Sequence, residues 1–544
     1  MRNLIRRFFL VQTSSITRAA WTIALASLVS RLLGVFRDRI LASSFGAGDV
    51  LDMYYAAFRV PDFIYNLIIV GALSAGFIPV FIAFRRSGEQ SGEESAWELT
   101  NVFLTISGIA LVVVAILLGV FAPILAPLIA PGFTPEKQAA VAALTRIILF
   151  SPILLGLSAI LGGVLQAYRN FFIYSLAPIF YNVGIIFGAL FLVPFYGVSG
   201  LAWGVVIGAF FHFLTQFFAV WRLGWRPHFI WQPRHSGLHE IMRLMVPRTL
   251  SLATQQLNIV FLTIIASFLA SGSLAIFNFS SNLYFVPVAF FGISYALAVF
   301  PALSEMALQE NDAGFRALIS SAVRSVLFFI VPATILFVLL RAQIVRVLFG
   351  SGAFDWNDTV LTFESLRWLS MSMFASSLIP VLVRGFYARH NTMIPFAVGI
   401  LSDALTIAGA YYLSRFFGVL GLAMAFSLGA VFQVVGLWVF LHFIAGDMDE
   451  KRIFFSVIRF TIAGMIMAVA VQGVKNIAGT VLGTNTFIAL SLQAALASLA
   501  GVVIYAIVLW FMQSEELHEF ITALSRKRER VKTTLGALNE GESL

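Results

Sequence analysis

Residues 195–202 read FYGVSGLA, and residues 416–423 read FFGVLGLA, 221 positions further along the chain. A second pair of landmarks has nearly the same offset, because Gly48 in SSFGAG corresponds to Gly272 in FLASG at a spacing of 224. Self-similarity at one spacing is the signature of an internal repeat. These stretches therefore predict that the chain contains two copies of one helical bundle.

The composition places both copies in a membrane. Of the 544 residues, 60% are hydrophobic and only 11% are charged, whereas soluble proteins have about 45–50% and about 25%. A compact soluble fold could not cover so much apolar surface with polar groups. The chain also has no Cys, which excludes disulfides and Cys-ligated metals. A soluble enzyme, a secreted disulfide scaffold and a disordered protein are excluded for the chain as a whole.

A membrane-crossing helix needs about 20 mainly apolar residues, and about fourteen stretches meet this requirement. They lie near residues 20–44, 52–84, 98–127, 138–168, 172–193, 198–222, 240–270, 273–305, 315–349, 359–388, 393–414, 418–445, 453–475 and 484–512.

The repeat divides these spans into two lobes. Six helices separate equivalent landmarks, so the lobes have the same orientation and are related by a pseudo-two-fold axis along the membrane normal. Tyr168 and Arg169 in the first lobe are predicted to correspond to Tyr387 and Arg389 in the second. The predicted segments are a cytoplasmic flank (1–19), the N-lobe (20–222), a basic linker (223–239), the C-lobe (240–445), helices 13 and 14 (453–512) and a cytoplasmic tail (513–544).

Basic residues in the short loops predict the orientation. Cytoplasmic loops carry an excess of Lys and Arg, and both termini are cytoplasmic if the pairs Arg6-Arg7, Arg85-Arg86 and Lys451-Arg452 lie inside. The net charge of +9 is spread between apolar runs, which favours the inner face of a membrane over nucleic acid as the partner.

The first two spans carry charges that lipid does not tolerate. An ionisable side chain within a bilayer costs about 2.5–3.5 kcal/mol unless it faces protein or water, yet Arg31, Arg37 and Asp38 lie in the first span and Asp52 and Arg59 begin the second. Arginine in a central cavity offers a forked set of donors that suits phosphate. The same charges could instead form structural ion pairs between the helices, and one reading does not exclude the other.

The other chemical signals are weaker. Asp403, inside the eleventh span, is a candidate cation or proton site, or the partner of an arginine or a hydroxyl. The sequence has no phosphate-binding Gly-rich loop and no nucleophile–base constellation. We therefore expect a transporter without covalent chemistry, cofactor or bound metal, driven by a coupling cation or by the membrane potential.

The first two helices resemble the MurJ (MviN) family of lipid II flippases, which belongs to the superfamily of multidrug, oligosaccharidyl-lipid and polysaccharide exporters. The resemblance is carried by Ser30-Arg31-Leu-Leu-Gly-Val-Phe-Arg37-Asp38, Phe45-Gly-Ala-Gly48, Asp52, Ala57-Phe-Arg-Val-Pro61 and Phe77-Ile-Pro79, and it continues to Gly385-Phe-Tyr-Ala-Arg389.

The resemblance implies a bacterial inner-membrane protein for cell-wall synthesis. Its substrate is the undecaprenyl-pyrophosphate-linked disaccharide-pentapeptide, its other partners are membrane lipids and cell-wall synthesis proteins, and it alternates between inward- and outward-open states. By position, Arg31, Arg37, Asp38 and Asp52 match cavity residues of the family. The last two helices are expected to form a groove for the lipid tail.

The chain departs from the family at several positions. Tyr65 and Asn282 stand where better-known members have arginine, and Val70 stands where an acidic residue is usual. Residues 249–270 of the seventh span lack the acidic residue that sodium-binding relatives have in their seventh helix. Arg59 is expected to compensate for one lost charge.

Three alternatives stay open: a flippase for another polyprenyl-pyrophosphate glycan, a cation-coupled drug exporter of this fold, and a non-transporting scaffold of the wall-synthesis machinery.

Overall fold

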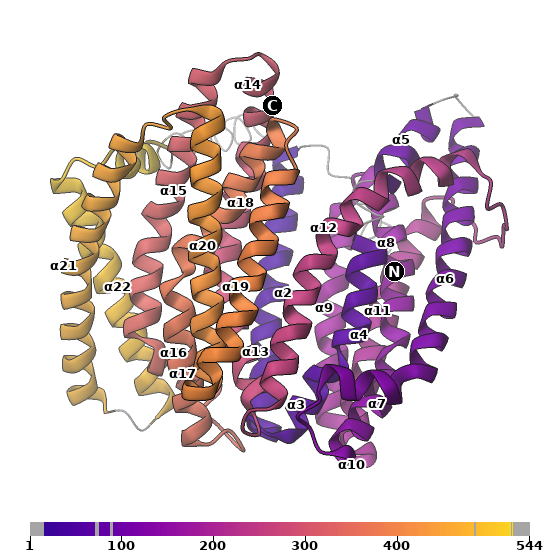
Figure 1. Ribbon diagram of the computed structural model, residues 1–544, viewed down its shortest axis with the longest axis horizontal. Helices are drawn as coiled ribbons and strands as arrows, with labels where there is room; N and C mark the ends of the chain where they lie inside the picture. The colour runs from indigo at the N-terminus through magenta and orange to yellow at the C-terminus, as the bar shows by residue number, and fades with distance from the viewer. Residues whose placement is uncertain (1–15, 71–75, 87–90, 484–485, 524, 526–544) are drawn as a thin grey trace, which may run out of the picture. The chain divides into compact units, whose positions relative to one another are not determined.

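The computed structural model describes residues 16–523 and residue 525, apart from residues 71–75, 87–90 and 484–485. Every regular element in this part of the chain is a helix (Figure 1). The predicted all-α membrane fold is therefore confirmed. Most of the predicted N-terminal flank and the basic stretch 526–532 of the predicted tail lie outside the described residues.

The helices of the first half of the chain are α2 (Ile16–Phe45), α3 (Asp49–Ala57), α4 (Arg59–Ile64), η1 (Tyr65–Val70), α5 (Ile78–Arg86), α6 (Ser91–Ile129), α7 (Pro135–Ile148), α8 (Phe150–Ala167), α9 (Phe171–Phe187), η3 (Gly188–Leu192), α10 (Val193–Tyr196), α11 (Ser199–Arg222) and α12 (Ser236–Ser267). Those of the second half are α13 (Ser273–Pro287), η4 (Val288–Ile293), α14 (Ser294–Leu308), α15 (Asp312–Leu339), α16 (Arg341–Leu348), α17 (Trp356–Met371), α18 (Met373–Ala388), α19 (Met393–Phe417), α20 (Val419–Ala445), α21 (Glu450–Leu482) and α22 (Phe487–Phe511).

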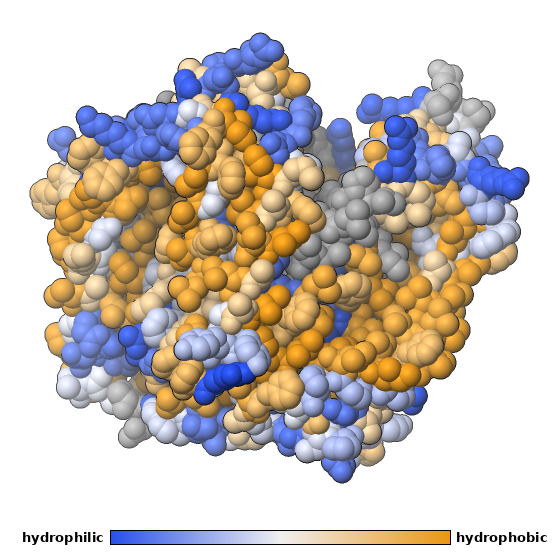
Figure 2. Space-filling model, in the orientation of Figure 1, coloured by the Kyte–Doolittle hydropathy of each residue, from blue (hydrophilic) through white to orange (hydrophobic). Residues whose placement is uncertain are grey.

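Ten helical segments of the described residues are long and apolar enough to cross a bilayer. An eleventh forms if α17 and α18, which are bent by 44° at residue 372, count as one span. Figure 2 shows hydrophobic residues over the middle of the helices on this face, with hydrophilic residues gathered at helix ends. The chain is a multi-span membrane protein.

The remaining three predicted spans coincide with α2, with the stretch from α3 to α5, and with α12. In these three stretches the described residues fall short of a full span: residues 71–75 interrupt the stretch between η1 and α5, and the described apolar part of α12 is the shorter helix Gln256–Ser267. The count of fourteen is not confirmed and stays a prediction.

Packing divides the chain into two compact units. Unit 1 comprises Met1–Phe279, Leu348–Thr362 and Thr406–Ala425, and unit 2 comprises Ser280–Val347, Phe363–Leu405 and Phe426–Leu544. The units reflect packing, whereas the predicted lobes reflect the sequence repeat. The lobe boundaries at 20–222 and 240–445 therefore stay a prediction.

The two copies of the repeat nevertheless make the same turn. Gly197 and Gly418 adopt φ angles of 57° and 56°, and each donates its N–H to the carbonyl four residues earlier at 2.8 Å. Three residues later, a Cβ on Gly200 or Gly421 would lie 2.6 or 2.4 Å from a backbone carbonyl carbon of the preceding helix. Only glycine suits a left-handed turn followed by so close a backbone approach.

A second pair of turns has the same offset. Arg169 after α8 and His390 after α18 both adopt a φ of 57°, and the next residue in each turn donates its N–H to the carbonyl five residues before it, at 2.8 and 3.0 Å. The predicted correspondence of Arg169 with Arg389 is therefore wrong by one residue. The turn geometry, and not the residue type, sets this register.

Within unit 1, α9 packs against α11 through glycines. A Cβ added to Gly184 would lie 2.2 Å from Cα of Gly208, which is far inside van der Waals contact. Small residues of this kind let membrane helices approach closely without a hydrophobic driving force.

Gly184→Ala is expected to destabilise the protein, because overpacking a close contact costs about 1–3 kcal/mol. Gly473→Ala in α21 is the matched control, since nothing lies within 4 Å of a Cβ at that position. There, alanine should instead stabilise the helix by up to about 1 kcal/mol. Thermal unfolding of both variants in detergent checks the opposite signs, and equal shifts would contradict this account of the helix contact.

In unit 2, a buried ion pair anchors the segment that follows α22. Arg324 of α15 and Glu516 are both 4% exposed, and a guanidinium nitrogen lies 2.5 Å from Oε1 of Glu516. Ser456 and Ser514 donate further hydrogen bonds to the same carboxylate, at 2.8 and 2.7 Å. Burial alone would raise the pKa of Glu516, but these hydrogen bonds outweigh burial and hold the pKa below its usual range.

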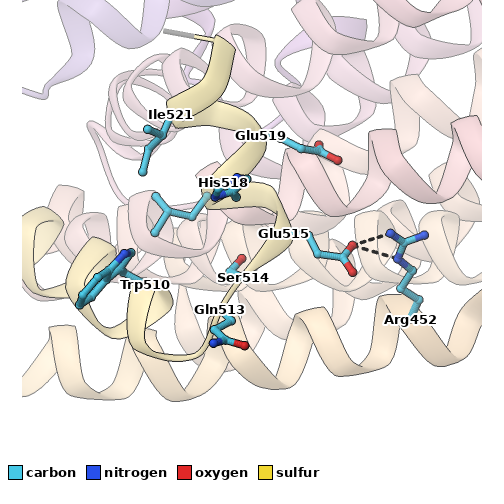
Figure 3. A pocket seen from close by; sticks show the side chains of 9 residues that line it. Arg452, Trp510, Gln513, Ser514, Glu515, His518, Glu519 and Ile521 are labelled. Carbon is cyan, nitrogen blue, oxygen red and sulfur yellow. Dashed lines mark hydrogen bonds and ion pairs between the residues drawn. The ribbon is translucent and has the colours of Figure 1, made fainter. Parts of the chain in front are cut away.

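Beside this pair lies a cavity of about 500 Å³, shown in Figure 3. Arg452 of α21 and Glu515 form an ion pair at its edge, at 2.5 Å. Because both side chains are about half exposed, this outer ion pair contributes little to the free energy of folding. The buried pair, whose partners cannot be solvated separately, is what holds the segment to α15 and α21.

Candidate functional site

Arg37, in the second half of α2, is held by two neighbours. Its Nε and Nη2 donate to Oδ1 of Asp38 at 3.0 and 2.7 Å, and its Nη1 donates to Oδ1 of Asn182 in α9 at 3.0 Å. Asn182 is itself oriented because its Nδ2 donates to the carbonyl of Pro178 at 3.2 Å. The guanidinium is therefore fixed in both position and direction.

This arrangement leaves Arg37 with capacity to bind another group. A guanidinium has five N–H donors, and three are used by partners among the described residues. The side chain of Arg37 is 23% exposed, whereas that of Asp38 is 3% exposed. Asp38 is therefore a buried residue that positions Arg37, and the group that a ligand can reach is the guanidinium of Arg37.

Arg59, the first residue of α4, has neutral partners. Its Nε donates to Oγ1 of Thr263 in α12 at 2.8 Å, and its Nη2 donates to Oδ1 of Asn278 in α13 at 3.4 Å. Asn278 is oriented by a 2.7 Å hydrogen bond from its Nδ2 to the carbonyl of Leu274. No ion pair joins Arg59 to an acidic side chain in the described part of the chain. The positive charge of Arg59 is therefore positioned without being neutralised by direct contact.

Arg31 lies in a different environment from Asp38, although seven residues place the two on one face of a straight helix. The side chain of Arg31 is exposed, and Asp38 is buried. Among the α2 side chains that are described, the tightly covered ones lie near the end of the helix, where Leu41 and Ala42 are 1% and 0% exposed. The structure thus brings Arg37 and Asp38 together but leaves Arg31 apart from them.

Asp52 caps α13. Its two carboxylate oxygens accept hydrogen bonds from the backbone N–H groups of Gly272, at 2.7 Å, and Ala275, at 2.9 Å. A carboxylate at a helix N-terminus satisfies donors that the helix leaves unpaired. Both oxygens of Asp52 are therefore committed to the N-terminus of α13.

Asp49 makes a second link, to the loop before α13. It pairs with Lys137 at 2.6 Å and accepts a short hydrogen bond from Ser271. Partial burial would raise the pKa of Asp49, but the hydrogen bonds from Lys137 and Ser271 outweigh it, so the pKa lies below its ordinary value.

A third loop, residues 351–355, contacts the turn between α2 and α3. The backbone N–H of Ala47 donates to Asp358 at 2.8 Å, and that of Ala353 donates to the carbonyl of Ser43 at 2.8 Å. Gly272, with a φ of 87°, lies so close that a Cβ there would be 1.8 Å from the carbonyl oxygen of Ala47. We call the loops 45–49, 270–273 and 351–355 the loop cluster.

The loop cluster lies at one end of unit 1. Figure 1 shows α3 at that end, together with α7 and α10, and α5 at the opposite end. The predicted orientation, with both termini inside, would place the loop cluster at the outer end.

Asp403 lies in α19 and in unit 2, whereas the other predicted site residues lie in unit 1. Its side chain is partly buried, and the neighbouring Ser402 donates to the carbonyl of Gly429 in α20 at 2.8 Å. Among the described residues, no group of three or more His, Cys, Asp or Glu is placed to hold a metal ion. The cation or proton role of Asp403 stays a prediction.

Sequence reasoning missed the neutral partners of the arginines. Asn182, Thr263 and Asn278 lie in apolar helices, and each holds an arginine from 145 to 219 positions away. A single amide in an apolar span was the available signal for Asn182 and Asn278. Thr263 has no such signal, because threonine is common in apolar helices.

Comparison with known families gives a match along most of the chain. A family model described as "Lipid II flippase MurJ" matches residues 41–523. The chain belongs to the MurJ lipid II flippase family. The resemblance seen in the first two helices is thereby confirmed.

Individual MurJ relatives agree with this. A lipid II flippase MurJ from Burkholderia cenocepacia is 27% identical over 421 residues, which cover 76% of this chain and 81% of that protein. Probable lipid II flippases MurJ are 30% identical over 428 residues in Haemophilus influenzae, covering 76% and 83%, and 27% identical over 498 residues in Thermotoga maritima, covering 92% and 97%.

Solved structures show the same fold. "Lipid II flippase MurJ, inward closed conformation" has a TM-score of 0.73 at 22% identity and covers 90% of this chain and 99% of that one. An inward-facing multidrug resistance transporter of the MATE family and MOP superfamily has a TM-score of 0.64 at 16% identity, covering 77% and 96%. At these identities the likeness concerns the fold alone.

Proposed function

We propose that the chain is a lipid II flippase of the bacterial inner membrane. It moves the lipid-linked cell-wall precursor from the inner to the outer leaflet and forms no covalent bond with it. The family match over residues 41–523 supports this function. The observation that carries the mechanism is that Arg59, in a stretch predicted to cross the membrane, is held by the neutral Thr263 and Asn278.

Arg59 and Arg37 are the proposed pyrophosphate ligands. Charge-assisted hydrogen bonds from guanidinium to phosphate are about twice as strong as neutral ones, and the planar fork matches two phosphate oxygens. Asp38 and Asn182 orient Arg37, and Thr263 and Asn278 orient Arg59. Arg31, which is exposed, is a further ligand in this proposal, whereas Asp52 holds the loop before α13 and does not contact the substrate.

The loop cluster is the proposed outer gate. It joins the α2–α3 turn, which lies in the predicted N-lobe, to two loops of the predicted C-lobe, through Asp49, Asp52 and Asp358. When these contacts are made, the outer end is closed and the substrate enters from the inner side. Release to the outer leaflet requires them to break.

The cycle needs a driving force but no ATP. One elementary charge moving through 100 mV corresponds to about 2.3 kcal/mol, which is enough to bias two states that differ by a few kcal/mol. We propose the membrane potential as this force, with Asp403 as the residue that would take a coupling cation or proton. Helices α21 and α22 pack on each other and on α15, and they are the proposed wall of the lipid-tail groove.

Transport in vesicles that hold only this protein tests the function. Fluorescent lipid II should cross the bilayer, and other polyprenyl-pyrophosphate glycans should cross more slowly. Equal or faster transport of another glycan would assign the chain to that substrate. Drug transport without lipid II transport would indicate an exporter, and the absence of all transport would favour a scaffold.

The proposed orientation has its own test, which the absence of Cys makes simple. Phe195→Cys and Leu308→Cys introduce single thiols at side chains that are 82% and 75% exposed, on predicted outer and inner ends. A membrane-impermeant maleimide applied to intact spheroplasts should label position 195 and should reach position 308 only after permeabilisation. The reverse pattern would invert the topology.

A further inference from the structure

Asp62 is an acidic residue in a stretch predicted to cross the membrane, and it has no part in the transport site or the loop cluster described above. It lies in α4, three residues after Arg59, and residues three apart are neighbours on one face of a helix. An ionisable side chain at such a depth is rare unless it has a functional partner. The carboxylate of Asp62 therefore needs an explanation.

The carboxylate of Asp62 makes no ion pair and accepts no hydrogen bond from the residues that the structure describes. Asn66 donates to the backbone carbonyl of Asp62 at 2.9 Å, and not to its side chain. Arg59 is close enough to pair with it, yet its guanidinium donates to Thr263 at 2.8 Å and to Asn278 at 3.4 Å. Asp62 and Arg59 are thus neighbours of opposite charge that do not form a direct ion pair.

The groups that face Asp62 do not neutralise its charge by contact. Its carboxylate interacts electrostatically with Arg59 of its own helix. The other groups near it are three phenols, which are uncharged near neutral pH. They belong to Tyr54 in α3, Tyr65 in η1 and Tyr181 in α9.

The sequence places no closer cation in the other helices that pack on α4. Helix α8 has no ionisable residue, and Arg146 of α7 is exposed, with its Nε bound to the carbonyl of Gly119 at 2.9 Å. The last ionisable residue of α12 is Arg248, fifteen residues before Thr263, which corresponds to about 22 Å along a helix. Residues 68–75, which follow along the chain, read IIVGALSA and contain no basic residue.

A carboxylate one turn from a phosphate-binding arginine weakens the binding of phosphate. Residues three apart on a helix have Cβ atoms about 6 Å apart, so a pyrophosphate on Arg59 would lie within strong repulsion of Asp62. Two like unit charges about 6 Å apart, at an effective dielectric constant of about 20, change a binding constant about 100-fold. A transport site must bind firmly enough to load its substrate and weakly enough to release it.

We propose that Asp62 sets the affinity of the transport site, because its carboxylate repels the pyrophosphate bound to Arg59 and so allows the substrate to be released. This inference rests on the pyrophosphate role proposed above for Arg59. Asp62 acts through its charge and makes no contact with the substrate. The repulsion grows with the charge of the ligand, so the residue affects a pyrophosphate more than a monophosphate.

Binding of farnesyl pyrophosphate to the full chain in detergent tests the proposal, because this short probe carries the pyrophosphate without a glycan. Asp62→Asn keeps the size of the side chain and removes its charge, and it should tighten binding at least about tenfold. Asp62→Glu keeps the charge and should bind like the wild-type protein. The matched control is Glu98→Gln, which removes an exposed carboxylate of α6 in unit 1 and should leave the Kd unchanged.

Unchanged or weaker binding in Asp62→Asn, or equal tightening in Glu98→Gln, would overturn the proposal. The charge of the probe separates repulsion from a change in the shape of the site. The tightening in Asp62→Asn should be smaller for farnesyl monophosphate and absent for farnesol. Equal tightening for all three probes would refute an electrostatic role.

Lipid II transport in proteoliposomes gives a readout that a purely structural role would not produce. Both the KM and the maximal rate should fall in Asp62→Asn, because tighter binding slows release. A lower maximal rate with an unchanged or higher KM would contradict the proposal. If the wild-type protein moves no lipid II, the proposed function fails and the binding result still stands. If Asp62→Asn binds and transports like the wild-type protein, only this inference fails.

Discussion

Arg59→Ala is expected to reduce lipid II transport about 100-fold or more while the protein still inserts and folds. Hydrogen bonds to a charged group contribute about 1.5–3 kcal/mol each. Loss of two such bonds to the pyrophosphate therefore removes about 3 kcal/mol, and about 1.4 kcal/mol corresponds to a factor of ten. Initial rates of fluorescent lipid II transport in proteoliposomes, at matched protein incorporation, measure the effect.

Three further variants separate the charge of Arg59 from its position. Arg59→Lys keeps the charge but loses the fork, so partial transport is expected. Thr263→Val removes one positioning partner of Arg59 and should cause a smaller loss. Arg146→Ala removes an exposed arginine of α7 whose Nε binds the carbonyl of Gly119, and transport should be retained. Full activity of Arg59→Ala would refute the ligand role, and loss in Arg146→Ala would show a general charge effect.

Gly272→Ala is expected to open the loop cluster and to abolish the transport cycle. A Cβ at this position would lie 1.8 Å from the carbonyl oxygen of Ala47, on a residue with a φ of 87°. The clash costs about 1–3 kcal/mol and the left-handed backbone adds about 1–2 kcal/mol, so the closed state should lose at least about tenfold in population.

A cysteine pair at positions 49 and 271 measures this shift. The two native side chains are hydrogen-bonded, and the chain has no other Cys. Oxidative cross-linking should be fast in the otherwise wild-type background and several-fold slower with Gly272→Ala. Gly197→Ala is the matched control, because Gly197 also has a positive φ but nothing lies within 4 Å of its Cβ position. Equal cross-linking in all three would show that the loop cluster is not held by this contact.

The fold was largely predictable because apolar length and repeat spacing are local properties of the chain. Eleven of the fourteen predicted spans coincide with helical segments that are long and apolar enough to cross a bilayer, if the bent α17–α18 pair counts as one. The glycines at 197 and 418 mark the same turn in both repeats, since only glycine fits its backbone. Arg169 and Arg389 did not correspond, because a side chain at a turn says little about the register of that turn.

The candidate site was predictable in its charges and not in its partners. Arg37 and Arg59 were identified because ionisable groups in apolar helices are costly and therefore rare. Asp52 carries the same signal, yet both its oxygens accept hydrogen bonds from the backbone at the start of α13, 220 and 223 positions away. A charge in a span shows that something must satisfy it, and the sequence does not show whether that is a ligand, a side chain or a helix end.

The amino-acid sequence alone determined that this protein crosses a membrane repeatedly and carries arginines where lipid would reject them, because hydropathy and charge belong to each residue wherever the chain goes. Tertiary structure decided which arginines have guanidinium N–H groups that are not already used by other side chains. Hydrogen bonds form over about 3 Å, and only folding brings Asn182 to Arg37, or Thr263 to Arg59, across more than a hundred intervening residues.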